Sequence, residues 1–175
     1  MKNSPSCTLT DKDHEILQRM LEYHGGQDEA MTRLLRRKLA RARVVARDEV
    51  PEDVVTLNSR ISFRVGNGPT ETRILCLDRT SGPVGYVLPI TTLRGLALLG
   101  LAEGRTAIVS RSPSLVEIIR LTAVHYQPEK AERMSLIEAA RPRFRVLEGG
   151  RQAGPVPITA FRHENDGEDP GPSAA

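Results

Sequence analysis

The stretch from Val54 to Val65, VVTLNSRISFRV, alternates between apolar and polar side chains, which is typical of a strand with one buried face. One face of this strand would carry Leu57, Ile61, Phe63 and Val65, and the other Asn58, Arg60, Ser62 and Arg64. The next residues, Gly66-Asn67-Gly68-Pro69, suit a tight turn because they tolerate unusual backbone angles. The pattern predicts the first strand of a curved antiparallel sheet. This stretch separates an N-terminal helical part, which runs to about Arg47, from a C-terminal part rich in predicted strands.

Two short helices are predicted in the front part. Thr10 is placed to cap the first, in which apolar residues recur at helical spacing from Ile16 to Leu21. Gly25-Gly26 ends this helix, and Asp28 caps a second one that ends near Val45. We expect an antiparallel hairpin whose arms, about 20 Å long, are marginal alone and lean on the sheet.

Further apolar runs predict four more strands, at Glu71–Leu77, Gly85–Leu88, Thr106–Val109 and Leu115–Tyr126. The last strand is apolar on both faces, which is typical of a central position. Between the second and third of these strands, Thr92 is expected to cap a small helix that ends at Gly100, with its leucines buried under the sheet. A weak helix is predicted from Glu129 to Ala140.

The division of the chain follows from these elements. We expect a flexible tail at residues 1–8, a short coiled-coil hairpin at 9–47, a β domain at 48–128 and a mostly disordered extension at 129–175. The end of the extension is acidic and rich in Gly and Pro, so it cannot bury enough apolar surface to offset its ordering entropy.

The composition narrows the class of protein. Aromatic residues make up only 3% of the chain and Trp is absent, so a stacking platform for single-stranded nucleic acid is not expected. Cys7 falls in the predicted tail and Cys76 in a strand, which predicts free thiols in a reducing cytoplasm. The sequence has no signal-peptide core and no apolar run near the roughly 20 residues of a membrane helix. We expect a cytoplasmic monomer without membrane contact.

Three pieces of the chain resemble a known family in their order and spacing: DVVTLNSRISFRV from Asp53, ALLGLAEG from Ala97 to Gly104, and VHYQP, which ends at Pro128. They resemble the Rnk proteins, called regulators of nucleoside diphosphate kinase, within the Gre-factor family of bacterial RNA polymerase-binding proteins. The resemblance covers about Leu9 to Pro128, and the pieces are specific together rather than singly.

The resemblance implies an α+β fold, in which the hairpin stands on an antiparallel β domain of FKBP-like fold with one small helix. It implies binding of bacterial RNA polymerase at its secondary channel, where the β domain grips the rim and the hairpin tip points inward. The partner residues that we expect are Asp28, Glu29, Arg33, Arg37, Asn58, Arg60, Arg64 and Arg105. A link to nucleoside diphosphate kinase comes only from the family name and is either direct or through transcription.

The chain also departs from the Gre pattern. Gre factors have a longer hairpin with acidic residues at its tip that help hold magnesium for RNA cleavage, whereas these arms are too short to reach as far. Leu93 stands where the family often has Pro, and Arg105 where Gre factors usually have Asp. We therefore expect a regulator that competes with Gre-type factors without cleaving RNA. The alternative is a Gre-like cleavage factor that uses Asp28 and Glu29.

Each candidate set also has a purely structural interpretation. Asp28 and Glu29 would brace a metal ion, cap a helix or touch basic residues inside the channel. Arg60 and Arg64 would form a docking surface or simply belong to the solvent-exposed face of an antiparallel sheet. The basic run on the second helix would contact nucleic acid or an acidic protein, or be solvated. This run consists of Arg33, Arg36, Arg37, Lys38, Arg41, Arg43 and Arg47.

No enzymatic motif stands out in the sequence. The four histidines are scattered without metal-ligand spacing, and neither a nucleophile elbow nor a phosphate-binding loop is present. We therefore expect no cofactor, no metal and no catalytic residue. An FKBP-like fold raises a prolyl isomerase as a further alternative, but Phe63, Tyr86 and Tyr126 are too few rings for its pocket, and a fold does not carry its activity with it.

Overall fold

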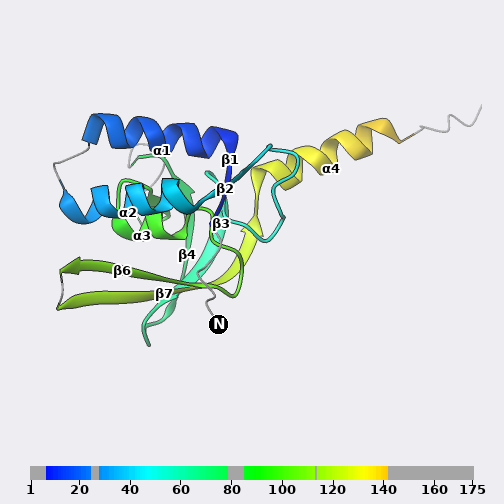
Figure 1. The fold of residues 1–175 in the computed structure, drawn as a ribbon. Coiled ribbons are helices and arrows are strands. Elements are labelled where there is room, and N and C mark those ends of the chain that lie inside the picture. Colours follow the sequence, from blue (N-terminus) through cyan, green and yellow to red (C-terminus); the bar gives the residue numbers. More distant parts are fainter. Residues whose placement is uncertain (1–6, 25–27, 79–84, 113, 142–175) are drawn as a thin grey trace, which may run out of the picture. The chain divides into compact units, whose positions relative to one another are not determined.

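A computed structural model describes residues 7–24, 28–78, 85–112 and 114–141 (Figure 1). In chain order the elements are β1 (Thr8–Thr10), α1 (Asp11–His24), α2 (Glu29–Arg41), β2 (Arg43–Val45), β3 (Arg60–Val65), β4 (Thr70–Cys76), β5 (Val87–Pro89), α3 (Leu93–Leu98), β6 (Thr106–Ser112), β7 (Leu115–Tyr126) and α4 (Pro128–Ala140). The predicted turn at Gly25-Gly26 and the extension beyond residue 141 lie outside the described residues.

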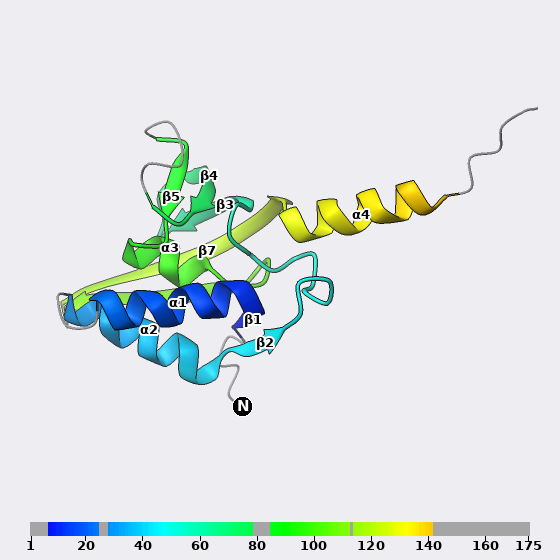
Figure 2. The same ribbon diagram turned by 90° about the horizontal axis from the view of Figure 1, so that it is seen from above.

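The two N-terminal helices lie side by side in opposite directions, as Figures 1 and 2 show. Both predicted caps are confirmed: Thr10 Oγ1 accepts a hydrogen bond from the Asp13 amide at 3.0 Å, and Asp28 caps α2. The predicted end of the second helix near Val45 is wrong. The helix ends at Arg41, because the next residues form β2.

The N-terminus enters the fold earlier than predicted. Thr8 was expected in a flexible tail, but it begins β1, which pairs in parallel with β2 from Thr8 opposite Arg43 to Thr10 opposite Val45. The Thr8 amide also donates to the carbonyl oxygen of Gly100 at 3.0 Å. These bonds tie the start of the hairpin to the end of α3.

The strands that follow the hairpin in the chain form a five-stranded sheet with the order β5-β4-β3-β7-β6. The pairs β3–β4, β3–β7 and β6–β7 are antiparallel, but β4 and β5 are parallel. The expectation of an antiparallel sheet is therefore wrong at this edge. Parallel strands cannot be joined by a tight hairpin, and the ten residues 77–86 separate β4 from β5.

The predicted first strand is shorter than its sequence pattern. β3 begins at Arg60 rather than Val54, because the chain first turns: the Ser59 amide donates to the Thr56 carbonyl at 3.2 Å, and Asn58 has φ of 65°. Within β3 the alternation holds, with Ile61 and Phe63 buried. The turn after β3 is also confirmed, since Gly66 has a positive φ of 53°.

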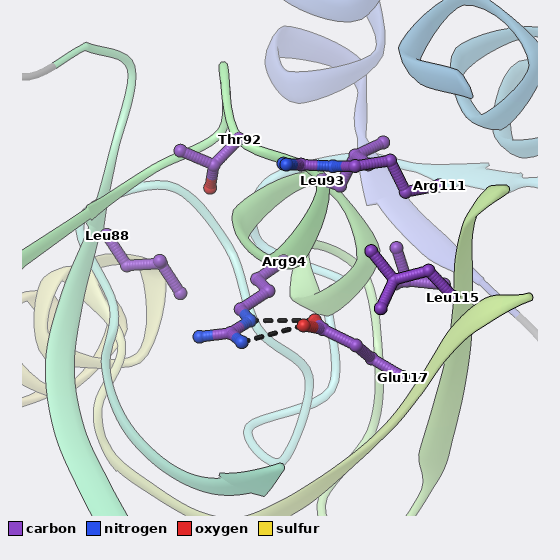
Figure 3. Close-up of a pocket in the computed structure, with 8 residues that line it drawn as sticks. Leu88, Thr92, Leu93, Arg94, Arg111, Leu115 and Glu117 are labelled. Atoms are coloured by element: carbon purple, nitrogen blue, oxygen red, sulfur yellow. Dashed lines mark hydrogen bonds and ion pairs between the residues drawn. The ribbon is translucent and has the colours of Figure 1, made fainter.

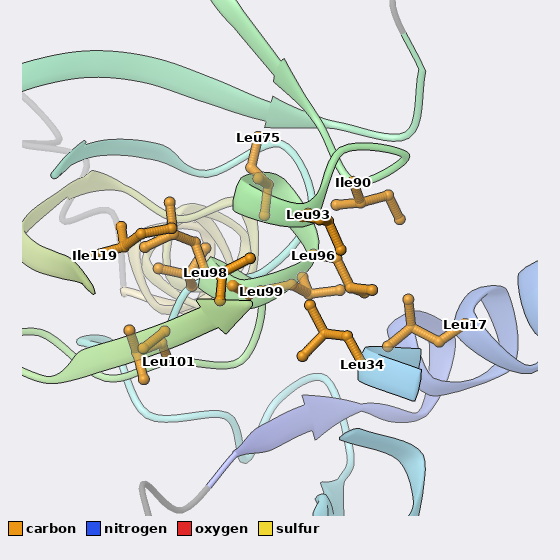
Figure 4. Packing of buried hydrophobic residues seen from close by; sticks show 14 of the residues in the cluster. Leu17, Leu34, Leu75, Ile90, Leu93, Leu96, Leu98, Leu99, Leu101 and Ile119 are labelled. Atoms are coloured by element: carbon orange, nitrogen blue, oxygen red, sulfur yellow. The ribbon is translucent and has the colours of Figure 1, made fainter. Parts of the chain in front are cut away.

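One hydrophobic core joins the hairpin to the sheet. Figure 4 shows Leu17 of α1 and Leu34 of α2 beside the leucines of α3. As predicted, Thr92 caps α3, and Leu93, Leu96, Leu98 and Leu99 are buried. The hairpin is thus packed on the sheet domain through side chains, as expected for arms too short to stand alone.

β7 has the predicted bounds and pairs with strands on both sides, β3 and β6. Its two faces differ, however. Ile119 and Leu121 are buried, whereas Val116 and Ile118 stay exposed on the other face. Its apolar pattern therefore marks a central strand but not one that is covered on both faces.

The predicted helix after β7 is confirmed as α4, which belongs to the same compact unit as the hairpin and the sheet. Side-chain bonds hold its start: Gln127 Nε2 donates to the carbonyl oxygens of Pro51 (2.8 Å) and Val54 (2.7 Å), and Lys130 pairs with Glu52. Within the described part of the chain, no helix is long and apolar enough to cross a membrane.

Candidate protein-docking site

The hairpin tip carries the two acidic residues singled out in the sequence. Asp28 Oδ1 accepts hydrogen bonds from the amides of Ala30 (2.9 Å) and Met31 (3.1 Å), so this carboxylate caps α2. Glu29 is exposed and lies 3.8 Å from Arg33. Capping is therefore what Asp28 does in the fold. A role of either acid toward a partner stays a prediction.

The basic run on α2 divides into exposed and buried residues. Arg33, Arg36 and Arg37 are exposed, and Arg37 Nη2 lies 3.4 Å from the carbonyl oxygen of Ile108 at the edge of β6. Lys38 is buried, and its Nζ donates to the carbonyl oxygens of Leu99 and Ala97. Burial lowers the pKa of the Lys38 ammonium.

The sequence pattern groups Lys38 with the other cations of this run, which would contact nucleic acid or an acidic protein or be solvated. A signal was present in the spacing, because Lys38 follows Leu34 by four residues and Leu35 by three, which places all three on one helix face. Both leucines are buried. A cation on an apolar stripe therefore pointed to an internal contact rather than to a surface.

The outer face of the sheet is the side turned away from the buried core. Its residues, read from the strand register, are Arg60, Ser62 and Arg64 of β3, Thr70, Thr72 and Ile74 of β4, Thr106, Ile108 and Ser110 of β6, and Val116, Ile118 and Arg120 of β7. Arg60 and Arg64 are exposed, as predicted. Ser62 lies on this face as predicted but is buried, because Thr72 Oγ1 and His125 Nε2 each lie 2.7 Å from its hydroxyl.

The last two predicted residues lie in turns rather than on the face of a strand. Asn58 precedes β3, and its amide donates to the Leu75 carbonyl at 2.7 Å. Arg105 is exposed between Gly104 and β6, and its carbonyl oxygen accepts from the Leu121 amide at 2.9 Å. The structure therefore distributes the predicted residues over the hairpin, the outer face of the sheet and two turns.

A cavity of about 330 Å³ lies between α3 and the β6–β7 hairpin (Figure 3). Its lining residues are Leu88, Thr92, Leu93, Arg94, Val109, Arg111, Leu115 and Glu117. The leucines and Val109 supply apolar walls, and Arg94 binds Glu117 through two bonds of 2.8 Å. This bond to Arg94 lowers the pKa of the Glu117 carboxyl.

The sequence predicts neither this cavity nor the ion pair within it. Arg94 and Glu117 are 23 residues apart, on α3 and β7, and no local pattern brings them together. An apolar hollow beside charged groups has the composition of a site that receives a side chain of another protein. Among the described residues, no three His, Cys, Asp or Glu side chains come together as metal ligands would.

No family model matches the chain. It is 31% identical to the solved structure of the prokaryotic transcription elongation factor GreA/GreB from Nitrosomonas europaea, with a TM-score of 0.54, over 70% of this chain and 100% of that one. It is 29% identical over 128 residues to the regulator of nucleoside diphosphate kinase of Escherichia coli K12, over 73% of this chain and 94% of that protein.

The chain therefore belongs to the Gre-factor family, with an α+β Gre-like fold, and is a Gre-like transcription factor. Within this family it is a homologue of Rnk, the regulator of nucleoside diphosphate kinase. It is also 30% identical over 131 residues to a probable cytosol aminopeptidase from Desulfotalea psychrophila. That match covers only 26% of the peptidase, so it carries no activity over to this chain.

Proposed function

We propose that this chain is a non-enzymatic regulator that binds bacterial RNA polymerase near its secondary channel and competes there with Gre-type factors. The observation that carries the proposal is the short hairpin on a Gre-like sheet. Its arms have 14 and 13 residues, and each spans about 20 Å. The protein can thus occupy a Gre site without the reach of a long hairpin. The proposal places it in the bacterial cytoplasm, where the polymerase works.

The grip is assigned to the β domain, for which we propose an FKBP-like arrangement of the sheet around α3. The cavity beside α3 combines apolar walls with an arginine–glutamate pair. Arg60 and Arg64, on the opposite face of the sheet, and Asn58 and Arg105, in the adjoining turns, would form a second contact surface. Apolar centres with charged rims are the usual anatomy of protein interfaces. The β domain would therefore supply the affinity for the polymerase, and the hairpin would occupy its secondary channel.

The hairpin is proposed to block the channel rather than to assist cleavage. Asp28 is engaged by two amides of its own helix, and Glu29 lies 3.8 Å from Arg33. A magnesium ion shared with the polymerase needs carboxylates that are free to turn toward it. The tip residues would then contact the channel wall without taking part in RNA cleavage.

Competition is tested with the full-length chain and core RNA polymerase. A fluorescently labelled Gre factor is bound to the polymerase and the chain is titrated in. We expect stoichiometric displacement of the label. A deletion of the hairpin is not the right tool, because Leu17 and Leu34 belong to the shared core. Binding of both proteins at once would contradict the proposal.

The cleavage alternative is tested on stalled elongation complexes. We expect no release of short 3′ RNA fragments from complexes incubated with the chain, while a Gre factor releases them in parallel as the positive control. Fragments that appear with the wild-type chain and disappear with Asp28→Ala/Glu29→Ala would establish the cleavage function instead.

The kinase in the name of the relatives is proposed to be linked through transcription rather than by contact. Calorimetric titration of the chain into nucleoside diphosphate kinase is expected to show no heat of binding, and a saturable signal would establish a direct partner. For prolyl isomerisation, the lining of the cavity contains no aromatic ring. A proline-peptide turnover assay is expected to stay at the uncatalysed rate.

A further inference from the structure

A thiol and an amine lie next to each other where the hairpin meets the sheet domain. Lys38 Nζ of α2 is 3.5 Å from the sulfur atom of Cys7, which lies 31 residues earlier in the chain. Cys7 directly precedes β1, and its carbonyl oxygen accepts a hydrogen bond from the Arg43 amide at 2.8 Å. Backbone bonds around β1 and β2 therefore hold the sulfur beside α2.

The sulfur of Cys7 is packed against the end of α3. It lies 3.9 Å from the Leu99 carbonyl oxygen, and a Cβ atom added to Gly100 would be only 2.7 Å from it. Cys7 is nevertheless half-buried rather than enclosed, whereas the other cysteine, Cys76, is buried. A small oxidant can therefore reach the Cys7 thiol while the sulfur stays in contact with its neighbours.

The amine of Lys38 is held in the interior without a counter-charge. Its side chain is only 8% exposed, and in the described part of the chain no carboxylate pairs with it. Burial lowers the pKa of the Lys38 ammonium group, which increases the fraction of neutral amine. The neutral amine keeps two N–H donors for the Leu99 and Ala97 carbonyl oxygens, so its lone pair is left for the sulfur.

We propose that Cys7 and Lys38 form a redox-sensitive modification site, in which hydrogen peroxide joins the two side chains through a sulfur–nitrogen bond. Peroxide oxidises a cysteine thiol to a sulfenic acid, and a sulfenic acid condenses with a thiol or a nitrogen atom beside it. The geometry supplies the nitrogen atom at 3.5 Å.

The reaction balances in two steps. First, the Cys7 thiol takes up one oxygen atom from hydrogen peroxide, so the sulfur is oxidised and the peroxide is reduced to water. Second, the lone pair of Lys38 Nζ attacks the sulfur, the S–N bond forms and the S–O bond breaks. The hydroxide leaves as water with a proton from the amine. The product therefore lacks one hydrogen atom from each side chain.

The cross-link would lock the base of the hairpin. It would tie the segment before β1 to α2, which hydrogen bonds and packing alone hold together in the reduced chain. A covalent bond that closes a loop stabilises a protein mainly by restricting the unfolded chain. A thiol reductant would reverse the lock, because two reductant thiols become a disulfide as the S–N bond returns to a thiol and an amine.

The test treats the folded full-length chain with hydrogen peroxide and maps its peptides by mass spectrometry. We expect the peptides of Cys7 and Lys38 to be joined, with a mass two hydrogen atoms below their sum and no tryptic cleavage after Lys38. The midpoint of thermal unfolding should rise by at least about 5 °C. Dithiothreitol should restore both the separate peptides and the original midpoint.

Variants separate the two partners of the bond. Cys76→Ser should cross-link like wild type, which distinguishes the bond from a disulfide, and Cys7→Ser should not cross-link. Lys38→Gln keeps two N–H donors but lacks the nucleophilic amine, so the sulfenic acid of Cys7 should persist and react with dimedone at least about tenfold more than in wild type. Lys12→Gln, which changes an exposed lysine, is the matched control and should cross-link fully.

Thermal melting establishes that each variant is folded, and the peptide map of the wild-type chain decides the question even if Lys38→Gln does not fold. Oxidation that ends at a sulfinic or sulfonic acid of Cys7, or at a disulfide with Cys76, with Lys38 unmodified, would overturn the inference. A bond from Cys7 to a different lysine would overturn it as well.

Discussion

Lys38 of α2 donates a hydrogen bond from its buried ammonium group to the carbonyl oxygen of Leu99, just beyond the end of α3. The same Nζ lies 3.4 Å from the Ala97 carbonyl and 3.5 Å from Cys7 Sγ. A cation at this position satisfies carbonyl groups that a helix end leaves without partners. One side chain therefore connects the hairpin, α3 and the segment that leads into β1.

Replacement of Lys38 by alanine should loosen the hairpin from the sheet domain. The change leaves a cavity and removes the donor to the Leu99 and Ala97 carbonyls, so we expect a loss of about 2–4 kcal/mol in the free energy of unfolding. Chemical denaturation measures the loss. Hydrogen exchange should also speed up at the Ala42 amide, which closes the last turn of α2.

Arg41→Ala, an exposed change on the same helix, is the control and should alter stability by less than about 0.5 kcal/mol. Equal stability of Lys38→Ala and wild type would show that the buried ammonium does not hold the hairpin in place.

Local signals in the sequence were enough for most elements. Thr92 beside a leucine-rich run predicted α3 and its cap, and the apolar run from Leu115 to Tyr126 predicted β7 with its bounds. β1 and β2 could not be predicted, because each has three residues and they pair across 32 intervening residues, 11 to 42. The hydrogen bonds that define them exist only after the hairpin has formed.

The cavity and the buried polar contacts were also beyond local reasoning. Arg94 and Glu117 come from different elements, and no local pattern marks Asp13, in the first turn of α1, as a buried acid. Periodicity tells which face of an element is apolar. It does not tell which polar side chain on another element will meet it.

Asp13 should make stability depend on pH. Its side chain is only 2% exposed, and burial, with the nearby charge of Glu129 adding to it, raises the pKa of the Asp13 carboxyl from 3.8 to about 6. The folded state thus holds the proton more tightly than the unfolded state. Unfolding releases the proton between about pH 4 and 6, so the free energy of unfolding falls as pH rises through this window, by at most about 3 kcal/mol.

Urea denaturation of wild type and Asp13→Asn at half-unit steps from pH 4 to 7 measures this dependence. The variant, whose amide does not titrate, should gain stability relative to wild type as pH rises. Asp11→Asn, an exposed change in the same helical turn, should run parallel to wild type. Parallel curves for Asp13→Asn and wild type would mean that the carboxyl titrates normally in the fold.

The ion pair in the cavity should show the opposite pH dependence. The two bonds from Arg94 lower the pKa of the Glu117 carboxyl, so the stability that the pair contributes is present above the ordinary value of 4.5 and is lost as pH falls below it. Because both side chains are partly exposed, we expect a coupling of only about 0.5–1 kcal/mol.

A double-mutant cycle with Arg94→Gln and Glu117→Gln, measured at pH 7 and pH 3.5, isolates this coupling. The control is the cycle for Glu29 and Arg33. Arg33 Nη1 lies 3.8 Å from Glu29 Oε1 and both side chains are mostly exposed, so the coupling energy should be near zero. A coupling that is the same at both pH values would argue against a charged pair.

Gly95 should be the least replaceable residue of α3. A Cβ atom added there would lie 2.1 Å from the Pro89 carbonyl oxygen and 2.7 Å from the Pro89 carbonyl carbon, and these backbone atoms cannot move aside as a flexible side chain would. Gly95→Ala must therefore push α3 away from β5. We expect a destabilisation of about 3 kcal/mol, at the upper end of the range for overpacked cores.

Thermal and urea denaturation measure the loss, and hydrogen exchange locates it. Two amides should lose protection before the rest of the sheet. The Ile90 amide donates to the Cys76 carbonyl oxygen at 2.8 Å, and the Thr92 amide donates to the Pro89 carbonyl oxygen at 3.1 Å. Gly104→Ala is the control: Gly104 has φ of 77° with open space around it, so the change costs about 1–2 kcal/mol of backbone strain and leaves those two amides protected. If Gly95→Ala kept both amides protected and cost no more than the control, the close contact between α3 and β5 would not exist in solution.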